Sequence, residues 1–235
     1  MRRFLFLDKF QPRPKFQTTC STHGKLILLL HVSILGLLTI TSCTFYDLPD
    51  QSGTLLFQDD FSSPTSGWNR YHGDTYISDY NDGRYHIATY QKNIEAWALP
   101  GFDFTDVVIE VTGTSVDGLE NNMYGILCRY LDSGNFYFFV ISSDGYAGIG
   151  VSAMGKRELL TGESMLPSEE ILQGTATNLI QAQCVGNQLS LSVNGSLIHQ
   201  VESDQIKSGD VGLIVGSYED EGTEIFFDNF SVRNP

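Results

Sequence analysis

Hydrophobic and polar residues alternate in short runs from Thr54 onward, and Gly, Asn, Asp and Ser separate these runs. Between 106 and 112 every second residue from Val107 is Val or Ile, as is typical of a β-strand with one buried face. The runs 123–130 and 136–141 are more uniformly apolar. They predict central strands that are covered on both faces.

Turn residues predict hairpins between these strands. Asn194-Gly195 is a strong signal, because a type I′ turn needs positive φ at both central residues, which Asn tolerates and Gly adopts freely. Ser143-Asp144-Gly145 is a second turn of this kind. The strands that these patterns add are 146–151, 178–185, 188–193, 197–201, 211–216 and 224–232.

The elements together predict an all-β chain, with a single short helical turn at 167–173. A sheet with one apolar face must bury that face against a partner layer. We therefore expect two antiparallel sheets stacked as a jelly-roll sandwich over residues 54–235.

Residues 1–42 have the pattern of a secretory signal peptide. Six basic residues, all within the first 25, precede an apolar run from Leu26 to Ile40. This run has 15 residues, whereas a membrane-spanning helix needs about 20. We therefore expect export, with an uncleaved signal anchor as the alternative.

The segment Ile40-Thr41-Ser42-Cys43 ends this run and resembles the lipobox of bacterial lipoproteins. The resemblance implies cleavage before Cys43, a diacylglyceryl group on its sulfur and acylation of the new amino terminus, which together give a stable membrane anchor. Residues 43–53 would then be a lipidated tether, and the domain would lie outside the cytoplasm in a bacterial cell envelope. In the alternative interpretation, Cys43 is an incidental residue of an ordinary signal peptide.

Charge restricts the partners of the exported part. The chain has 14 Lys and Arg against 28 Asp and Glu. Removal of residues 1–42 takes away six of the bases and one acid, which leaves a formal net charge of −19. Such a chain repels polyanions, so nucleic acid and bare anionic lipid are poor partners, whereas neutral polymers and cations are not excluded.

The order of motifs along the chain resembles laminin-G-like and 3-keto-disaccharide-hydrolase-type domains of the concanavalin A-like lectin and glucanase superfamily. The motifs are Leu-Phe-Gln-Asp-Asp-Phe at 56–61, Gly67-Trp68, 124–130, 135–139, Asn194-Gly195, 209–213 and 227–230. The resemblance implies a concanavalin A-like fold over nearly all of 54–235. Within this superfamily, members bind glycans, cleave glycans or bind proteins, so function has to be argued from the site.

Glycosidases of such folds place two carboxylates about 5 to 10 Å apart. On one strand such a pair would occupy alternating positions, and no strand of this sequence shows convincing alternating acids. The histidines are scattered singly, without a Ser-His-Asp grouping. We therefore expect a protein that is not an enzyme. The alternative is a hydrolase of glycans or keto-disaccharides whose acids come from distant loops.

A divalent cation is a further hypothesis. Asp59 and Asp60 lie at the start of the domain and Asp228 lies in its last strand, and these strands are commonly neighbours in concanavalin A-like sandwiches. Three carboxylates that converge there would suit a structural Ca²⁺. Alternatively, Asp228 accepts backbone hydrogen bonds at a strand end.

Aromatic residues motivate a ligand-binding hypothesis, because aromatic rings stack on the C–H faces of sugars. The candidates are Trp97, Arg129, Tyr130 and Tyr137, which lie in or beside the central strands. Aromatic residues of a sandwich are also ordinary core residues, and Trp68 is expected to fill one end of the sandwich.

Four cysteines complete the inventory. Cys20 leaves with the signal peptide and Cys43 carries the lipid, so Cys128 and Cys184 are left as a pair in an oxidising compartment. A disulfide between two strands is one interpretation. Two buried free thiols are the other, because both residues lie in apolar runs.

Overall fold

Strands provide all the regular secondary structure of the residues that the computed structural model describes, which are 53–116, 121–218 and 222–235. None of these ranges holds a helix of the length and hydrophobicity that a membrane span requires. The strands are β1 (Leu55–Asp59), β2 (Tyr71–His72), β3 (Tyr76–Asn81), β4 (Arg84–Thr89), β5 (Ile94–Ala98), β6 (Val107–Ser115), β7 (Asn122–Asp132), β8 (Asn135–Ile141), β9 (Tyr146–Ala153), β10 (Lys156–Leu159), β11 (Leu166–Pro167), β12 (Thr177–Val185), β13 (Gln188–Val193), β14 (Ser196–Glu202), β15 (Asp210–Ser217) and β16 (Thr223–Arg233).

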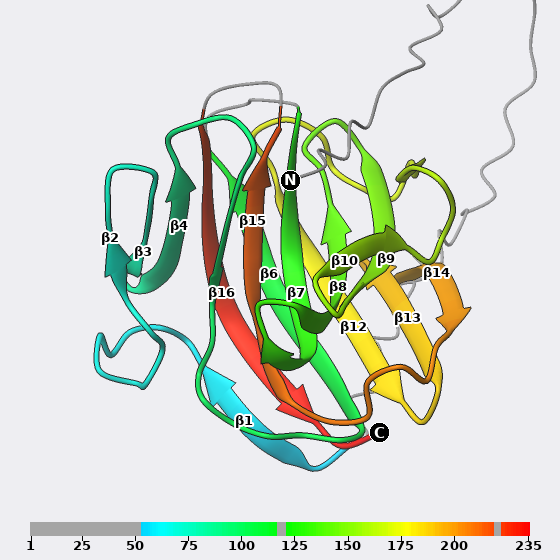
Figure 1. The fold of residues 1–235 in the computed structure, drawn as a ribbon. Helices are drawn as coiled ribbons and strands as arrows, with labels where there is room; N and C mark the ends of the chain where they lie inside the picture. Colours follow the sequence, from blue (N-terminus) through cyan, green and yellow to red (C-terminus); the bar gives the residue numbers. More distant parts are fainter. Residues whose placement is uncertain (1–52, 117–120, 219–221) are drawn as a thin grey trace, which may run out of the picture. The chain divides into compact units, whose positions relative to one another are not determined.

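These strands form two antiparallel sheets, which Figure 1 shows as two layers of a sandwich. The nine-stranded sheet has the order β14-β13-β12-β6-β16-β4-β3-β2, and β1 pairs with the end of β16. The seven-stranded sheet has the order β10-β9-β8-β7-β15-β5, and β11 pairs with β9. The all-β, two-sheet, jelly-roll-like sandwich predicted from the alternation is therefore confirmed.

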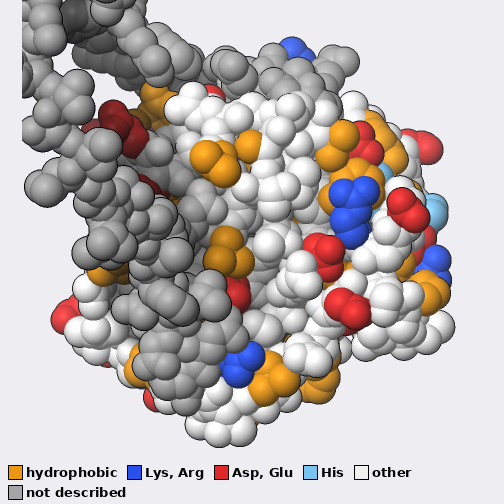
Figure 2. Space-filling model, turned by 180° about the vertical axis from the view of Figure 1, so that it is seen from behind, with side chains coloured by type: hydrophobic (Ala, Val, Ile, Leu, Met, Phe, Trp, Pro, Cys, Tyr) orange, Lys and Arg blue, Asp and Glu red, His pale blue; other side chains and the backbone are white. Residues whose placement is uncertain are grey.

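The core lies between the two sheets. In β6 the buried and partly exposed residues alternate from Val107 to Ser115, so one side of the strand faces the core and the other side faces outward. Figure 2 looks from behind Figure 1 and shows hydrophobic side chains scattered among polar ones on that side of the molecule. The outward residues of β6 include Glu110 and Thr112, so this side of the strand is largely polar.

The predicted strands are all present. The two runs predicted as central, 123–130 and 136–141, are β7 and β8, which lie in the interior of the seven-stranded sheet. The helical turn predicted at 167–173 is wrong, because the chain there begins with β11, an edge strand on β9. Pro167 fits such an edge, since it has no N–H to donate to a further strand.

Candidate ligand-binding face of the seven-stranded sheet

A second apolar layer covers the outer side of the seven-stranded sheet. Its buried members are Met123, Leu127, Phe136, Phe138, Val140 and Ile214. Its partly exposed members are Trp97, Leu99, Tyr130, Leu159, Met165 and Tyr218. The sheet therefore has hydrophobic side chains on both faces, whereas the nine-stranded sheet has them mainly on one. The partly exposed members of this outer layer make it a candidate interaction surface.

Aromatic rings from three strands of the seven-stranded sheet gather in this layer. Trp97 comes from β5, Tyr130 from β7 and Phe136 from β8. The Trp97 ring centroid lies 6.3 Å from that of Tyr130 and 6.2 Å from that of Phe136, and the Tyr130 and Phe136 rings stack at 5.5 Å. Phe136 is fully buried, whereas Trp97 and Tyr130 remain partly exposed. We call Trp97, Tyr130, Phe136 and Phe138 the aromatic face.

Glycines on two strands of the sheet, β9 and β15, leave room for the side chains of the outer layer. Gly150 of β9 lies directly beneath the Phe138 ring, and a Cβ at this position would lie 2.1 Å from Cζ of that ring. Gly212 of β15 has a similar relation to Leu99, at 2.7 Å from Cδ2. The side chains therefore form a low, flat layer over the strands, which suits a flat ligand such as a sugar ring.

One ion pair borders the aromatic face. The Arg157 guanidinium lies over the Phe136 ring, 5.0 Å from its centroid, and pairs with the Glu95 carboxylate. Both side chains are partly exposed, at 30% and 24%. Burial lowers the pKa of Arg157 and raises the pKa of the Tyr130 hydroxyl. At neutral pH the face thus offers a cationic donor, a carboxylate acceptor and a neutral hydroxyl beside apolar rings.

Two of the four residues predicted to bind ligand lie elsewhere. Arg129 is 1% exposed and Tyr137 is fully buried. Tyr137 follows Phe136 in β8 and so points to the opposite side of the sheet, where its hydroxyl bonds to Ser203 and to the amide of Ile206. The structure thus brings Trp97 and Tyr130 together, whereas Tyr137 faces the opposite side of its strand and Arg129 is buried away from them.

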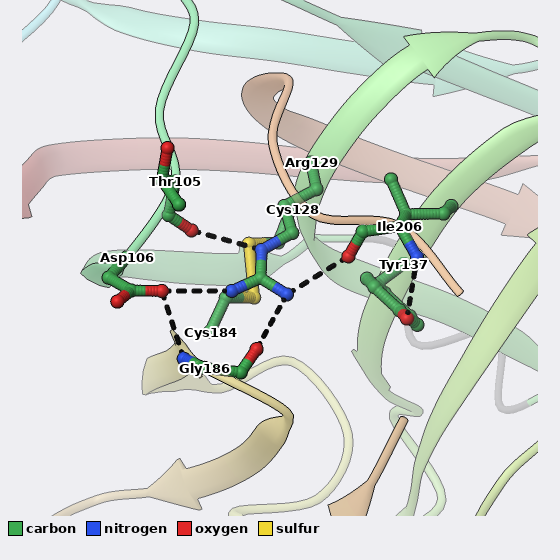
Figure 3. The surroundings of a disulfide bond; sticks show 8 residues. All are labelled: Thr105, Asp106, Cys128, Arg129, Tyr137, Cys184, Gly186 and Ile206. Atoms are coloured by element: carbon green, nitrogen blue, oxygen red, sulfur yellow. Dashed lines mark hydrogen bonds and ion pairs between the residues drawn. A yellow bond between two sulfur atoms is a disulfide. The ribbon is translucent and has the colours of Figure 1, made fainter. Parts of the chain in front are cut away.

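The structure has a disulfide bond between Cys128 and Cys184, which is one of the two alternatives that the sequence left open. It joins β7 of one sheet to β12 of the other across the core, and both residues are fully buried. Figure 3 shows this bond next to the Arg129 guanidinium.

The structure does not bring Asp59, Asp60 and Asp228 together as metal ligands. The first and last strands are neighbours as expected, since β1 pairs with β16. However, each carboxylate binds a local group: Asp59 accepts from Trp68 Nε1 at 2.9 Å, Asp60 accepts from Ser62, and Asp228 accepts from the amide of Asn229. Within the described part of the chain there is no group of three His, Cys, Asp or Glu side chains that could hold a metal ion.

Two acids of the seven-stranded sheet, Glu95 and Asp210, lie far apart. Glu95 pairs with Gly216 on β15, whereas Asp210 lies at the other end of that strand. Six residues of strand separate these positions by about 20 Å, well beyond the carboxylate spacing of glycosidases. Asp210 also serves the fold, since its carboxylate accepts from the amides of Gly101 and Phe102 at 2.9 Å each.

A separate polar cluster lies on β3 and β4 of the nine-stranded sheet. Asp79 accepts hydrogen bonds from Arg70 and His72, and the Arg70 guanidinium lowers the pKa of Asp79 to about 2. His86 lies 3.0 Å from Glu224, and burial lowers the pKa of this histidine. Each titratable group thus has a partner inside the cluster.

A comparison with protein-family models and with curated proteins gives no match. Solved structures of similar fold exist. One is the carbohydrate-binding module CBM66 from Bacillus subtilis, at 13% identity and a TM-score of 0.57, over 72% of this chain and 96% of that chain. Another is a Bacillus subtilis protein of unknown function with a galectin-like fold, at 11% identity and a TM-score of 0.55, over 77% and 96%.

A third similar structure is the catalytic domain of an endo-1,3-beta-glucanase, a laminarinase, from Thermotoga petrophila RKU-1. It has 10% identity and a TM-score of 0.53, over 77% of this chain and 97% of that chain. These identities are low, so the likeness shows a shared galectin-like or concanavalin A-like sandwich.

Proposed function

We propose that this protein is a non-catalytic binding protein whose β-sandwich holds carbohydrate on the aromatic face of the seven-stranded sheet. The observation that carries the proposal is the pair of partly exposed rings, Trp97 and Tyr130, on a flat apolar layer bordered by Arg157 and Glu95. The rings would stack on the C–H faces of sugar rings. The charged pair and the Tyr130 hydroxyl would bind sugar hydroxyls and so fix the orientation of the ligand.

The similar structures support a role that involves glycans, because one is titled a carbohydrate-binding module and another the catalytic domain of a laminarinase. The separation of Glu95 from Asp210 is the observation that favours binding over cleavage. Glu95 and Asp210 lie near opposite ends of β15 and cannot share one glycosidic bond.

The proposal includes attachment to a membrane outside the cytoplasm. It is supported by the lipobox-like Ile40-Thr41-Ser42-Cys43 after an apolar run, which lies outside the described residues. The Cys128–Cys184 disulfide agrees with this location, because structural disulfides form and persist in oxidising compartments.

A glycan array tests the proposal directly. The full-length chain, purified in detergent micelles, is expected to retain neutral glycans. Trp97→Ala is expected to weaken binding at least about fivefold, since one stacked ring contributes about 1 kcal/mol or more. Tyr90→Ala is the matched control, because Tyr90 is an exposed tyrosine outside the aromatic face. Equal binding by wild type and Trp97→Ala would overturn the assignment of the face.

The likeness to a laminarinase domain makes hydrolysis the second candidate function. Incubation of any glycan retained on the array with wild type, followed by product analysis, separates the two candidates. Cleavage that is lost in Glu95→Gln would favour a hydrolase, whereas retention of intact glycan would favour a binding protein.

A further inference from the structure

Relative to β15, strand β7 contains one extra residue at Arg129, and relative to β8 the segment 128–132 is longer by two residues. Tyr130 pairs with Asp210 on β15, whereas Leu127 pairs with Gly212, so three steps along β7 match two steps along β15. Arg129 has a φ of 52°, which is unusual for a residue with a side chain. This combination is a β-bulge.

The bulge decides which way Tyr130 points. In a regular strand, residue 130 would lie on the same side as Cys128, whose side chain is in the core between the sheets. Because Arg129 is an extra residue, Tyr130 instead packs with the outer layer, beside Trp97. The bulge therefore supplies one of the two exposed rings of the aromatic face.

The buried side chain of Arg129 is fixed by hydrogen bonds to distant parts of the chain. Its Nε donates to the Thr105 carbonyl at 3.0 Å, and its Nη1 donates to the carbonyls of Ile206 at 3.0 Å and Gly186 at 3.1 Å. Its Nη2 contacts Asp106 at 3.1 Å. Figure 3 shows these groups converging on the guanidinium from three separate segments of the chain. A buried charge with this many partners has little freedom to move.

The backbone around Arg129 is fixed from two further sides. A Cβ at Gly209 would lie 2.6 Å from the carbonyl carbon of Arg129 and 2.8 Å from the amide nitrogen of Tyr130, so only glycine permits this approach. On the other side, the preceding residue, Cys128, is joined to Cys184 of the opposite sheet. Gly209 and the disulfide thus both restrict the backbone next to Arg129.

We infer that Arg129 is a positioning residue for the ligand-binding face: its buried guanidinium fixes the β7 bulge, and the bulge turns Tyr130 outward against Trp97. The inference rests on the proposed function for its biological meaning, because it takes Trp97 and Tyr130 as the ligand contacts. Arg129 itself contacts no ligand. It acts only through the direction of the next residue.

The test measures the ¹⁹F chemical shift of labelled Trp97, in the absence of ligand. The full-length chain is labelled with 5-fluorotryptophan, which gives one ¹⁹F signal each for Trp68 and Trp97, assigned with Trp97→Phe. Tyr130→Ala is expected to shift the Trp97 signal. Arg129→Ala should reproduce that shift, and so should Arg129→Gly, which keeps the positive φ but loses the guanidinium. Arg84→Ala, which removes an arginine over Phe226 on the other sheet, should leave the Trp97 signal unchanged.

Arg129→Lys covers the case in which the truncated variants do not fold, because it keeps the charge but cannot bind several carbonyls in a planar fork. Folding is checked by a cooperative thermal transition, and the Trp97 signal of each folded variant is read. A wild-type Trp97 signal in any folded Arg129 variant would overturn the inference.

A binding measurement distinguishes a failure of this inference from a failure of the proposed function. A soluble β-1,3-glucan is titrated into wild type and each folded variant. If wild type binds, Arg129→Lys is expected to bind at least about tenfold more weakly, and undiminished binding by this variant would overturn the positioning role. If wild type binds neither this glucan nor any glycan of the array, the proposed function fails, while the ¹⁹F shifts still decide whether Arg129 positions Tyr130.

Discussion

Asp59 fixes the buried Trp68 ring by a hydrogen bond. Its carboxylate accepts from Trp68 Nε1 at 2.9 Å and from the amide of Phe61 at 2.8 Å, and Trp68 is only 3% exposed. Asp59→Ala leaves two buried donors without a partner, which is expected to lower the free energy of unfolding by about 1–3 kcal/mol.

Urea unfolding measures this effect, and the chain supplies a matched control in the next residue. Asp60 is exposed and bonds to Ser62. Asp60→Ala is therefore expected to change the free energy of unfolding by less than about 0.5 kcal/mol. Equal effects of the two substitutions would contradict the role assigned to Asp59.

Asp79 is expected to make stability depend on acid pH. The Arg70 guanidinium lowers the pKa of Asp79 from 3.8 to about 2 in the folded chain. Because the folded pKa lies below the unfolded one, the stabilisation is complete above about pH 4 and is lost as the pH falls to about 2. The melting temperatures of wild type and Asp79→Asn should therefore differ most near neutral pH and converge near pH 2.

The control for this pH series is Asp74→Asn, which removes an exposed acid from the turn between β2 and β3. Its melting temperature should follow that of wild type over the whole range. A difference between wild type and Asp79→Asn that stays constant down to pH 2 would show that the effect of Asp79 is not electrostatic.

At the scale of elements, β9 provides the space that the Phe138 ring of the aromatic face occupies. Gly150→Ala would place a methyl group where the Phe138 ring lies, 2.1 Å from its Cζ. The ring must lift, so we expect a loss of about 1–3 kcal/mol from the free energy of unfolding. Gly148→Ala on the same strand meets the flexible end of Leu159 at 3.0 Å and should cost less. Chemical denaturation of both variants checks the order.

The disulfide couples β7 to β12 and hence one sheet to the other. It closes a segment of 56 residues, and such cross-links typically stabilise by about 2–4 kcal/mol through the unfolded chain. Cys128→Ser with Cys184→Ser is expected to lose this amount in urea unfolding. Wild type unfolded in the presence of a reductant should approach the variant, whereas the variant should not respond to the reductant.

Alternation predicted the strands because it depends only on neighbouring residues, and the uniformly apolar runs predicted the interior positions of β7 and β8. The site could be predicted only in part. Trp97 and Tyr130 were chosen by residue type, and the structure places both in the outer apolar layer. The burial of Arg129 could not be predicted, because the carbonyls that bind it come from residues 105, 186 and 206. A bulge that depends on such distant groups leaves little trace in the local pattern.

The helical turn predicted at 167–173 was wrong for a related reason. Its residues have adequate helix propensity, but pairing of Leu166 and Pro167 with β9 fixes the chain as an edge strand. The carboxylate cluster predicted from Asp59, Asp60 and Asp228 followed from a correct neighbourhood of strands. Strand neighbourhood does not determine where side chains point, and hydrogen bonds to nearby amides direct them apart.

For the whole molecule, the outer faces of the two sheets differ in the side chains that they present. The nine-stranded sheet presents alternating polar residues such as Glu110 and Thr112, which keep that side hydrated. The seven-stranded sheet presents the aromatic face, where Arg157 is paired with Glu95 and so adds no net charge. Ligand choice at this face should then depend on ring contacts nearby and on the net charge of the chain at longer range.

Net charge leads to a prediction about the kind of glycan. The chain has 28 acids against 14 bases, and cleavage before Cys43 would make the balance more acidic. A neutral soluble glucan should bind with an affinity that changes little between about 0.05 M and 0.5 M salt. A carboxymethylated form of the same glucan should bind at least about tenfold more weakly at the lower salt, because like charges repel over a Debye length that exceeds 10 Å there.

High salt distinguishes this repulsion from steric rejection. If charge is the cause, the carboxymethylated glucan should regain affinity as the Debye length falls to a few ångströms, while the neutral glucan stays constant. Isothermal titration of both polymers at several salt concentrations measures the two slopes. Tighter binding of the anionic polymer at low salt would mean that Arg157 is available to it despite Glu95, and the ion pair at the border of the aromatic face would then be an anion-binding element.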